Sequence, residues 1–262
     1  MDLRPLGSTG IEVSPLGLGT VKLGRNQQVK YPRPFEIPDD AAVRDLLVLA
    51  ADLGINLIDT APAYGASEER LGRLLPGPRD RWVVVTKVGE EFEAGRSRFD
   101  FSAAATRASV ERSLRRLQAD CLDVVLIHSD GDDLRILEQE PVVETLLRLK
   151  EEGLIRACGM SSKTVEGGLR VVERCDLAMA TCNLEYDDER PVFEAAAQAG
   201  KGVLVKKGLQ SGHIPGAEGV RAAMSHIFAQ PGVSSVIVGT INPAHLRENV
   251  AIAESVLGQE GA

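Results

Sequence analysis

Short runs of apolar, mostly β-branched residues alternate with longer amphipathic segments along most of the chain. This alternation is typical of βα units built around a parallel sheet. Eight apolar runs are candidate strands: residues 16–19, 56–59, 82–86, 122–127, 155–160, 177–182, 203–205 and 235–238. Helical periodicity and capping residues predict helices near 39–54, 67–75, 102–117, 143–153, 164–174, 189–199, 218–229 and 243–257.

Eight strands alternating with eight helices favour an α/β fold of the closed (β/α)8 TIM-barrel type, with an open doubly wound sheet as the alternative. The first strand gives Gly17-Leu18-Gly19-Thr20, which lacks the GxGxxG pattern of a Rossmann dinucleotide site. The segment 6–11 predicts a β-hairpin that plugs the bottom of the barrel. We see no linker, so residues 1–262 are expected to form one barrel domain, with long surface loops at 25–38 and 90–100.

The composition narrows the class of protein. Of the 262 residues, 44% are hydrophobic and 26% are charged, as in ordinary globular proteins, and the net charge is -8. This charge argues against nucleic acid and anionic membranes as partners, and no apolar run approaches the ~18 residues of a membrane span. The four cysteines lack metal-site spacing, so we expect reduced thiols, no metal and a cytoplasmic location.

Four residues that can transfer or stabilise a proton follow consecutive predicted strands. Asp59 ends the second strand and Tyr64 follows five residues later, while Lys87 and His128 stand at the ends of the third and fourth strands. Each has an ordinary structural explanation when taken alone, such as a turn cap, a loop aromatic, a solvated strand end or a core histidine. Together they fall where a barrel carries its reactive groups.

The chemistry of these four residues is that of carbonyl reduction. We expect the Lys87 ammonium to lower the pKa of the Tyr64 phenol, so that Tyr64 acts as a general acid. Asp59 would keep Lys87 charged, and His128 would position the carbonyl oxygen. None of the four supplies a hydride, which points to a nicotinamide cofactor.

The chain resembles the aldo-keto reductase superfamily over nearly its whole length. Residues 6–20 are similar to that family's N-terminal hairpin and first strand, and Asp59-Thr60-Ala61-Pro62-Ala63-Tyr64-Gly65 is similar to its Asp-Thr-Ala-x-x-Tyr-Gly signature. Lys87 and His128 stand where the other two members of the family's tetrad belong. The resemblance implies a barrel that binds NADPH in extended form and reduces aldehydes or ketones.

The resemblance also implies positions for the cofactor. Ser161, Ser162 and Asn183 stand where the family holds the nicotinamide amide, and Lys206 and Lys207 replace the usual stacking aromatic, near the pyrophosphate. The remaining positions expected to bind the cofactor are Gly19, Thr20, Asp59, Gly239, Thr240, His245 and Asn249.

We therefore expect an NAD(P)H-dependent oxidoreductase that reduces a small-molecule carbonyl, with NADP favoured over NAD, acting as a monomer or weak homo-oligomer. One alternative is a nicotinamide-binding sensor or regulatory subunit with little turnover. Another is a barrel lyase or aldolase that uses Lys87 as a Schiff-base amine. The substrate and the preferred direction of reaction stay open at this point.

Overall fold

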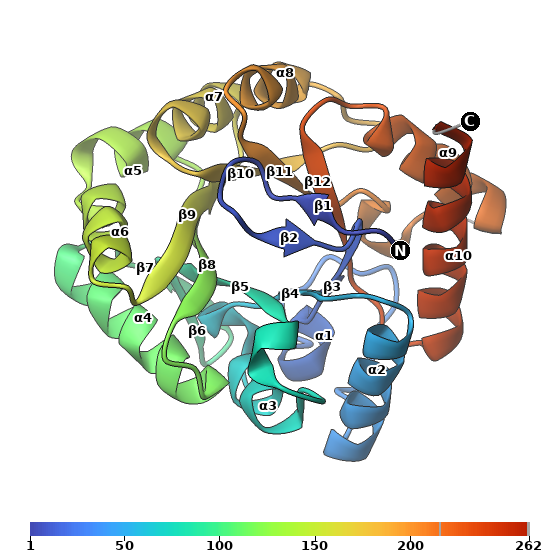
Figure 1. Ribbon diagram of the computed structural model, residues 1–262. Helices are drawn as coiled ribbons and strands as arrows, with labels where there is room; N and C mark the ends of the chain where they lie inside the picture. Colours follow the sequence, from blue (N-terminus) through green and yellow to red (C-terminus); the bar gives the residue numbers. More distant parts are fainter. Residues whose placement is uncertain (215, 261–262) are drawn as a thin grey trace.

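Eight parallel strands close into a barrel in the computed structural model, which describes residues 1–214 and 216–260 (Figure 1). The barrel strands are β3 (Leu16–Gly19), β4 (Leu57–Asp59), β5 (Val83–Val88), β8 (Leu122–His128), β9 (Ile155–Ser161), β10 (Leu177–Thr181), β11 (Gly202–Lys206) and β12 (Val233–Val238). β12 pairs with β3 and closes the ring. The predicted (β/α)8 barrel is confirmed, and the open-sheet alternative is wrong.

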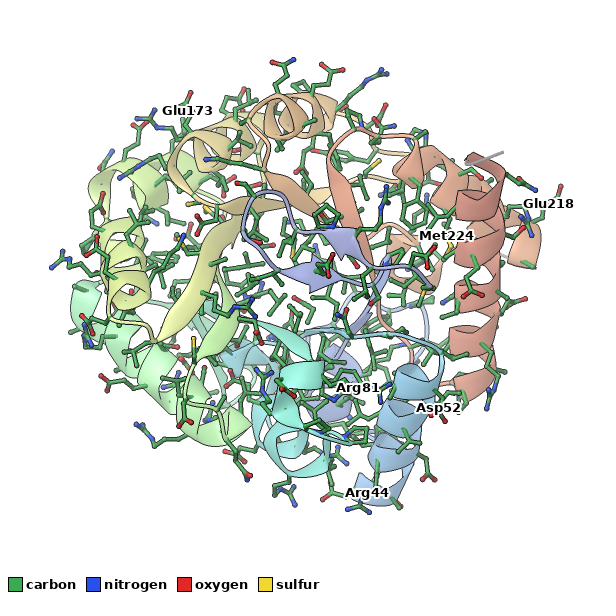
Figure 2. All side chains as sticks on the ribbon, viewed as in Figure 1. Arg44, Asp52, Arg81, Glu173, Glu218 and Met224 are labelled. Atoms are coloured by element: carbon green, nitrogen blue, oxygen red, sulfur yellow. The ribbon has the colours of Figure 1, made fainter. Side chains whose placement is uncertain are left out.

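Helices surround the strands and carry the charged surface. They are α1 (Val21–Gly24), α2 (Asp40–Asp52), α3 (Ser67–Leu74), α4 (Ala103–Leu117), α5 (Asp133–Gln139), α6 (Val142–Glu151), α7 (Val165–Arg174), α8 (Arg190–Gln198), α9 (Gly216–Phe228) and α10 (Pro243–Glu260). Short 3-10 turns are η1 (Pro62–Tyr64), η2 (Arg79–Arg81) and η3 (Gln210–Gly212). Charged side chains such as Arg44 and Glu173 lie on the outer ring (Figure 2). The sequence pattern missed α1 and α5, which are too short to show helical periodicity.

The predicted N-terminal hairpin is present and covers one end of the barrel (Figure 1). β1 (Arg4–Pro5) pairs antiparallel with β2 (Glu12–Val13). Leu6, Ile11 and Val13 are buried and pack with the apolar side chains inside the barrel. Gly7 adopts φ +56° and lies so close to the backbone of Gly202 that a side chain there would collide with it. The hairpin therefore closes the end opposite the strand C-termini.

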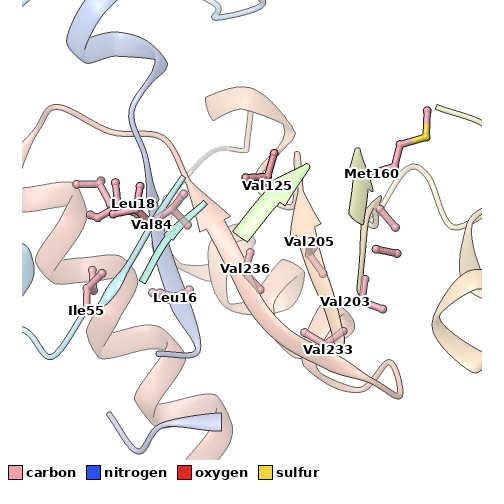
Figure 3. Close-up of a cluster of buried hydrophobic side chains, with 14 of the residues drawn as sticks. Leu16, Leu18, Ile55, Val84, Val125, Met160, Val203, Val205, Val233 and Val236 are labelled. Carbon is pink, nitrogen blue, oxygen red and sulfur yellow. The ribbon is translucent and has the colours of Figure 1, made fainter. Parts of the chain in front are cut away.

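The strands separate two apolar layers. Val83 and Val85 belong to the cluster inside the barrel, whereas Val84 belongs to the larger cluster between strands and helices. Figure 3 shows part of this outer layer, including Val84 and Leu18. The alternation follows from the two-residue period of a strand. It also fixes which polar residues face inward at the strand ends.

Residues 90–100, which we expected to form a loop, instead form a second hairpin. β6 (Glu90–Glu93) pairs antiparallel with β7 (Arg96–Phe99), and both turn residues between them have positive φ. Charged residues dominate this segment, so its strands lack the apolar alternation by which strands are predicted. In the part of the chain that the structure describes, no helix is long and apolar enough to cross a membrane.

Candidate active site

Three of the predicted catalytic residues point into the mouth of the barrel because side chains alternate between the two faces of a strand. Asp59, Lys87 and His128 each stand at or near the C-terminal end of a strand. The residues two positions before them belong to the apolar interior: Leu57, Val85 and Leu126. Because side chains two residues apart in a strand share a face, all three polar groups project inward above this core.

Lys87 lies at the centre of the group. Its Nζ donates hydrogen bonds to Asp59 Oδ1 at 2.5 Å and to the backbone oxygen of Thr60 at 2.8 Å, and the side chain is 2% exposed. Nζ also lies 4.9 Å from the centre of the Tyr64 ring. The rings of Tyr64 and His128 are 6.2 Å apart in an edge-on arrangement. The structure thus brings all four residues together.

The pKa of Tyr64 departs from the expectation that Lys87 lowers it. Burial raises the pKa of Tyr64 well above 10, and the negative charges of Asp59 and Glu90 raise it further, while Arg25 lowers it. The charge of Lys87 is largely balanced by the Asp59 carboxylate bonded to it. In this arrangement the phenol keeps its proton throughout the neutral pH range.

The sequence did not single out Glu90, the first residue of β6. Its Oε2 lies 2.7 Å from His128 Nδ1, and its Oε1 accepts a hydrogen bond from Ser97 Oγ at 2.5 Å. Burial would raise the pKa of Glu90, but contacts with His128, Ser97 and Arg25 lower it to about 2. Burial also lowers the pKa of His128, and Glu90 opposes that effect. A prediction of the 90–99 hairpin would have placed Glu90 beside the site, but the charged sequence of this segment gives no strand pattern.

A cavity of about 980 Å³ opens next to the four residues. The predicted cofactor-binding residues that line it are Gly19, Asp59, Ser161, Lys206, Lys207, Gly239, Thr240, His245 and Asn249. Three others do not line it. Thr20 donates to the backbone oxygen of Asp59, and the Asn183 amide donates to the backbone oxygen of Lys207. Ser162 Oγ is buried with no hydrogen-bond partner among the described residues.

Lys206 ends β11 and reaches across to β9. Its Nζ donates to Ser161 Oγ at 2.9 Å and to the backbone oxygen of Ser162. Burial lowers the pKa of Lys206 to about 8, with Glu189 acting in the opposite sense. The ammonium is therefore held beside the two serines rather than free in solvent.

The cavity is electropositive although the protein is acidic. The cations in its lining, besides Lys87, are Lys22, Arg25, Lys30, Arg33, Lys163, Lys206 and Lys207, and its acidic members are Asp59, which pairs with Lys87, and Glu248. The whole chain has a net charge of -8. A concave surface lined by one sign of charge concentrates ligands of the opposite sign, so the cavity favours an anion.

The loop at 25–38 forms one wall of the cavity. The Lys22 ammonium lies 4.0 Å from the centre of the Tyr31 ring, and Tyr31 packs edge-on against Phe35. The Arg25 guanidinium stacks 3.5 Å above the ring of Phe92 in β6. The contacts of these aromatic rings with distant segments cannot be read from local sequence patterns.

One group of side chains elsewhere has the donor types of a metal site, which we did not expect. The ligand atoms of Cys182, Asp187 and His226 all lie within 4.8 Å of one another. Burial raises the pKa of the Cys182 thiol to about 12, and the Asp187 charge acts in the same direction. The thiol is therefore protonated at neutral pH in the absence of a metal. None of the three residues belongs to the cavity lining.

The fold and this site define a class of barrel oxidoreductases. The sequence model of the Aldo/keto reductase family matches residues 15–220, and the chain belongs to that family. The predicted family resemblance is confirmed.

Several characterised or solved proteins are similar to this chain. L-galactose dehydrogenase of Arabidopsis thaliana is 30% identical, over 96% of this chain and 88% of its own length. A solved structure described as an aldo-keto reductase of Pseudomonas aeruginosa is 60% identical, covers 97% of this chain and 96% of that chain, and has a TM-score of 0.90. The holo form of the aldo-keto reductase AKR11C1 from Bacillus halodurans is 26% identical, with coverage of 97% and 91% and a TM-score of 0.81.

Proposed function

We propose that the protein is an NAD(P)H-dependent oxidoreductase that reduces the carbonyl of aldehydes or ketones, with Tyr64 as the general acid. The observation that carries this proposal is the convergence of Asp59, Tyr64, Lys87 and His128 at one cavity. These groups hold a proton donor and a hydrogen-bonding imidazole at the same point, as protonation of a carbonyl oxygen requires.

Each residue has a distinct part in the proposal. Tyr64 keeps its proton because burial raises its pKa, so it carries the proton that the nascent alkoxide takes up. Lys87 lies 4.9 Å from the centre of the phenol ring with its charge largely balanced by Asp59, so Arg25 is the cation that favours the phenolate left after proton transfer. Asp59 orients Lys87, and His128 orients the carbonyl oxygen.

The same contacts weigh against the aldolase alternative. A Schiff-base lysine must present a neutral, reachable amine to the substrate. Lys87 is almost fully buried, and both Asp59 and the backbone oxygen of Thr60 accept hydrogen bonds from its Nζ. Lys87 therefore does not meet the requirement for Schiff-base chemistry.

The cavity suits a nicotinamide dinucleotide, which supplies the hydride when bound. Its size and its surplus of cations match an extended anionic ligand. Of the three residues expected to hold the cofactor amide, Ser161 lines the cavity and would contact it directly, whereas Ser162 and Asn183 lie outside the lining. Lys206 and Lys207 would face the pyrophosphate, with Gly19 alongside, while Thr20 lies outside the lining and would act only through its hydrogen bond to Asp59.

We assign the adenosine phosphate to the far end of the cavity and favour NADP over NAD. Thr240, His245 and Asn249 would hold this part of the cofactor, next to Gly239. All four residues line the cavity. A protonated histidine or a threonine hydroxyl there can bind a 2′-phosphate, whereas NAD offers only hydroxyls at this point.

The test compares binding with turnover. Fluorescence titration with NADPH and NADH measures the preference, and multiple-turnover oxidation of each with a panel of simple aldehydes measures activity. Tyr64→Phe is expected to abolish most turnover with little change in cofactor binding, whereas Tyr186→Phe, outside the cavity, serves as the matched control. Cofactor binding with no turnover in the unaltered protein would favour the sensor alternative instead.

Other expectations accompany this proposal. Residues 1–262 would act as one barrel domain on a small-molecule carbonyl, in the cytoplasm and as a monomer or weak homo-oligomer. These points remain predictions.

A further inference from the structure

Glu90 faces the imidazole of His128 from the β6–β7 hairpin. The carboxylate is largely buried, 11% exposed, and one of its oxygens lies 2.7 Å from His128 Nδ1. Its other oxygen accepts a hydrogen bond from Ser97 and lies 3.8 Å from an Arg25 nitrogen. Contacts on both oxygens therefore hold the carboxylate in one orientation.

The contact between Glu90 and His128 fixes where the imidazole carries its proton. Oε2 lies off the direction of an ideal Nδ1–H hydrogen bond, but at 2.7 Å the negative carboxylate still repels a lone pair on Nδ1 and attracts a proton there. The Glu90 carboxyl is ionised because its pKa is lowered to about 2. The proton therefore belongs to Nδ1, and in neutral His128 the lone pair is on Nε2, at the opposite edge of the ring.

We propose that Glu90 is a positioning residue that keeps the His128 proton on Nδ1, so that protonation of Nε2 decides which substrate the site binds. A bare Nε2 accepts a hydrogen bond from the hydroxyl of an alcohol. A protonated Nε2 donates one to the oxygen of a carbonyl compound. The site therefore binds carbonyl substrates better at low pH and alcohol substrates better at high pH. This inference rests on the proposed function.

Several titratable groups of the described residues act on His128 or contact its ring. They are Glu90 from β6, Lys87 from β5, Lys206 from β11 and Tyr64 from η1. Burial lowers the pKa of His128 below 6.5, Glu90 raises it, and Lys87 and Lys206 lower it. Lys87 is paired with Asp59, and Tyr64 is uncharged at neutral pH. Glu90, which lies 3.8 Å from Arg25, and Lys206, whose charge Glu189 opposes, therefore shift the pKa of His128 in opposite directions.

The chain offers a matched control on the same hairpin. Glu91, the next residue, forms an ion pair with Arg112 on α4 instead of contacting His128. Glu91→Gln removes one carboxylate charge from the hairpin without touching the imidazole. Glu90→Gln removes the charge beside His128 and keeps a side-chain oxygen near Nδ1, whereas Glu90→Ala removes both.

The first experiment needs no turnover. The protein has four histidines, so nitrogen NMR of ¹⁵N-histidine-labelled protein resolves each ring, with His128 assigned from its loss in His128→Gln. We expect Nδ1–H at His128 in the unaltered protein and in Glu91→Gln. Glu90→Ala should move the proton to Nε2, and Glu90→Gln should lower the pKa of His128 by about one unit. An Nε2–H tautomer in the unaltered protein would overturn the inference.

The second experiment measures KM against pH for one aldehyde with NADPH and for its alcohol with NADP. Above the His128 midpoint the aldehyde KM should rise about tenfold per pH unit, and below it the alcohol KM should rise in the same way. Glu90→Gln should shift both curves to lower pH by about one unit. Identical curves for Glu90→Gln and Glu91→Gln would refute the positioning role. Failure of every substrate with the unaltered protein would refute the proposed function while the NMR result still stood.

Discussion

Tyr31 lies directly against Gly239. Tyr31 belongs to the loop after α1 and Gly239 follows β12, yet a Cβ atom placed on residue 239 would lie 2.9 Å from the Tyr31 hydroxyl oxygen. Both residues line the cavity. Because Gly239 has no side chain, Tyr31 can occupy this space. The position of the 25–38 loop therefore depends on a glycine at residue 239.

We predict that Gly239→Ala displaces Tyr31 and destabilises the protein by about 1 kcal/mol, the low end for overpacking, because the clashing atom is the tip of a loop side chain. Tyr31→Ala removes that tip. In the Tyr31→Ala background, Gly239→Ala should therefore have almost no further effect on the urea midpoint. The same loss in both backgrounds would show that the two residues do not interact.

The buried ammonium of Lys206 predicts a pH-dependent stability. Its pKa is about 8 in the folded protein and 10.5 ordinarily, so between these values the unfolded chain binds more protons than the native one. Stability therefore rises with pH across this window, and the full cost of burying the charge applies below pH 8. We expect Lys206→Met to be more stable than the unaltered protein at pH 7.

This stability difference should shrink as the pH approaches 10, where the native lysine is already neutral. Urea unfolding of both proteins at pH 7 and pH 10 measures it. The comparison of two proteins at each pH cancels the titration of all other groups. A difference that stays constant between the two pH values would contradict the lowered pKa.

Arg70 forms hydrogen bonds near both ends of the 25–38 loop. Arg70, on α3, donates to the backbone oxygens of Leu23 and Pro38 at 2.6 Å each, and its Nε donates to Asp40 at 2.8 Å. Leu23 precedes the loop and Pro38 is its last residue. Arg70 reaches these acceptors with three separate nitrogens, whereas a lysine would need all three acceptors within hydrogen-bond distance of its single nitrogen.

We therefore predict that Arg70→Lys lowers the free energy of unfolding by about 2 kcal/mol, since at least one charged hydrogen bond is lost and buried acceptors remain. Arg73→Lys is the matched control. Arg73 is on the same helix and pairs with the same Asp40, but its side chain is 54% exposed. Urea unfolding should show a change below about 0.5 kcal/mol for the control. An equal loss of unfolding free energy in Arg70→Lys and Arg73→Lys would show that the hydrogen bonds of Arg70 to the loop do not stabilise the protein.

The sequence predicted the parts of the site that depend on strand period and not those that depend on loop packing. Asp59, Lys87 and His128 could be placed because an inward-facing apolar residue stands two positions before each of them. The position of Glu90 and the contact of Tyr31 with Gly239 could not be predicted in this way. They join segments that are distant in the sequence, and a charged hairpin has no apolar alternation to reveal it.

The buried pair of Lys87 and Asp59 predicts strongly non-additive mutations. Lys87→Met leaves the Asp59 carboxylate buried without its partner, which should cost about 3–5 kcal/mol of stability. Asp59→Asn alone leaves the ammonium with only neutral acceptors. The double variant removes both charges, so its loss should be clearly smaller than the sum of the single losses. Urea unfolding of all four proteins gives the coupling energy, and simple additivity would mean that the 2.5 Å contact contributes nothing to stability.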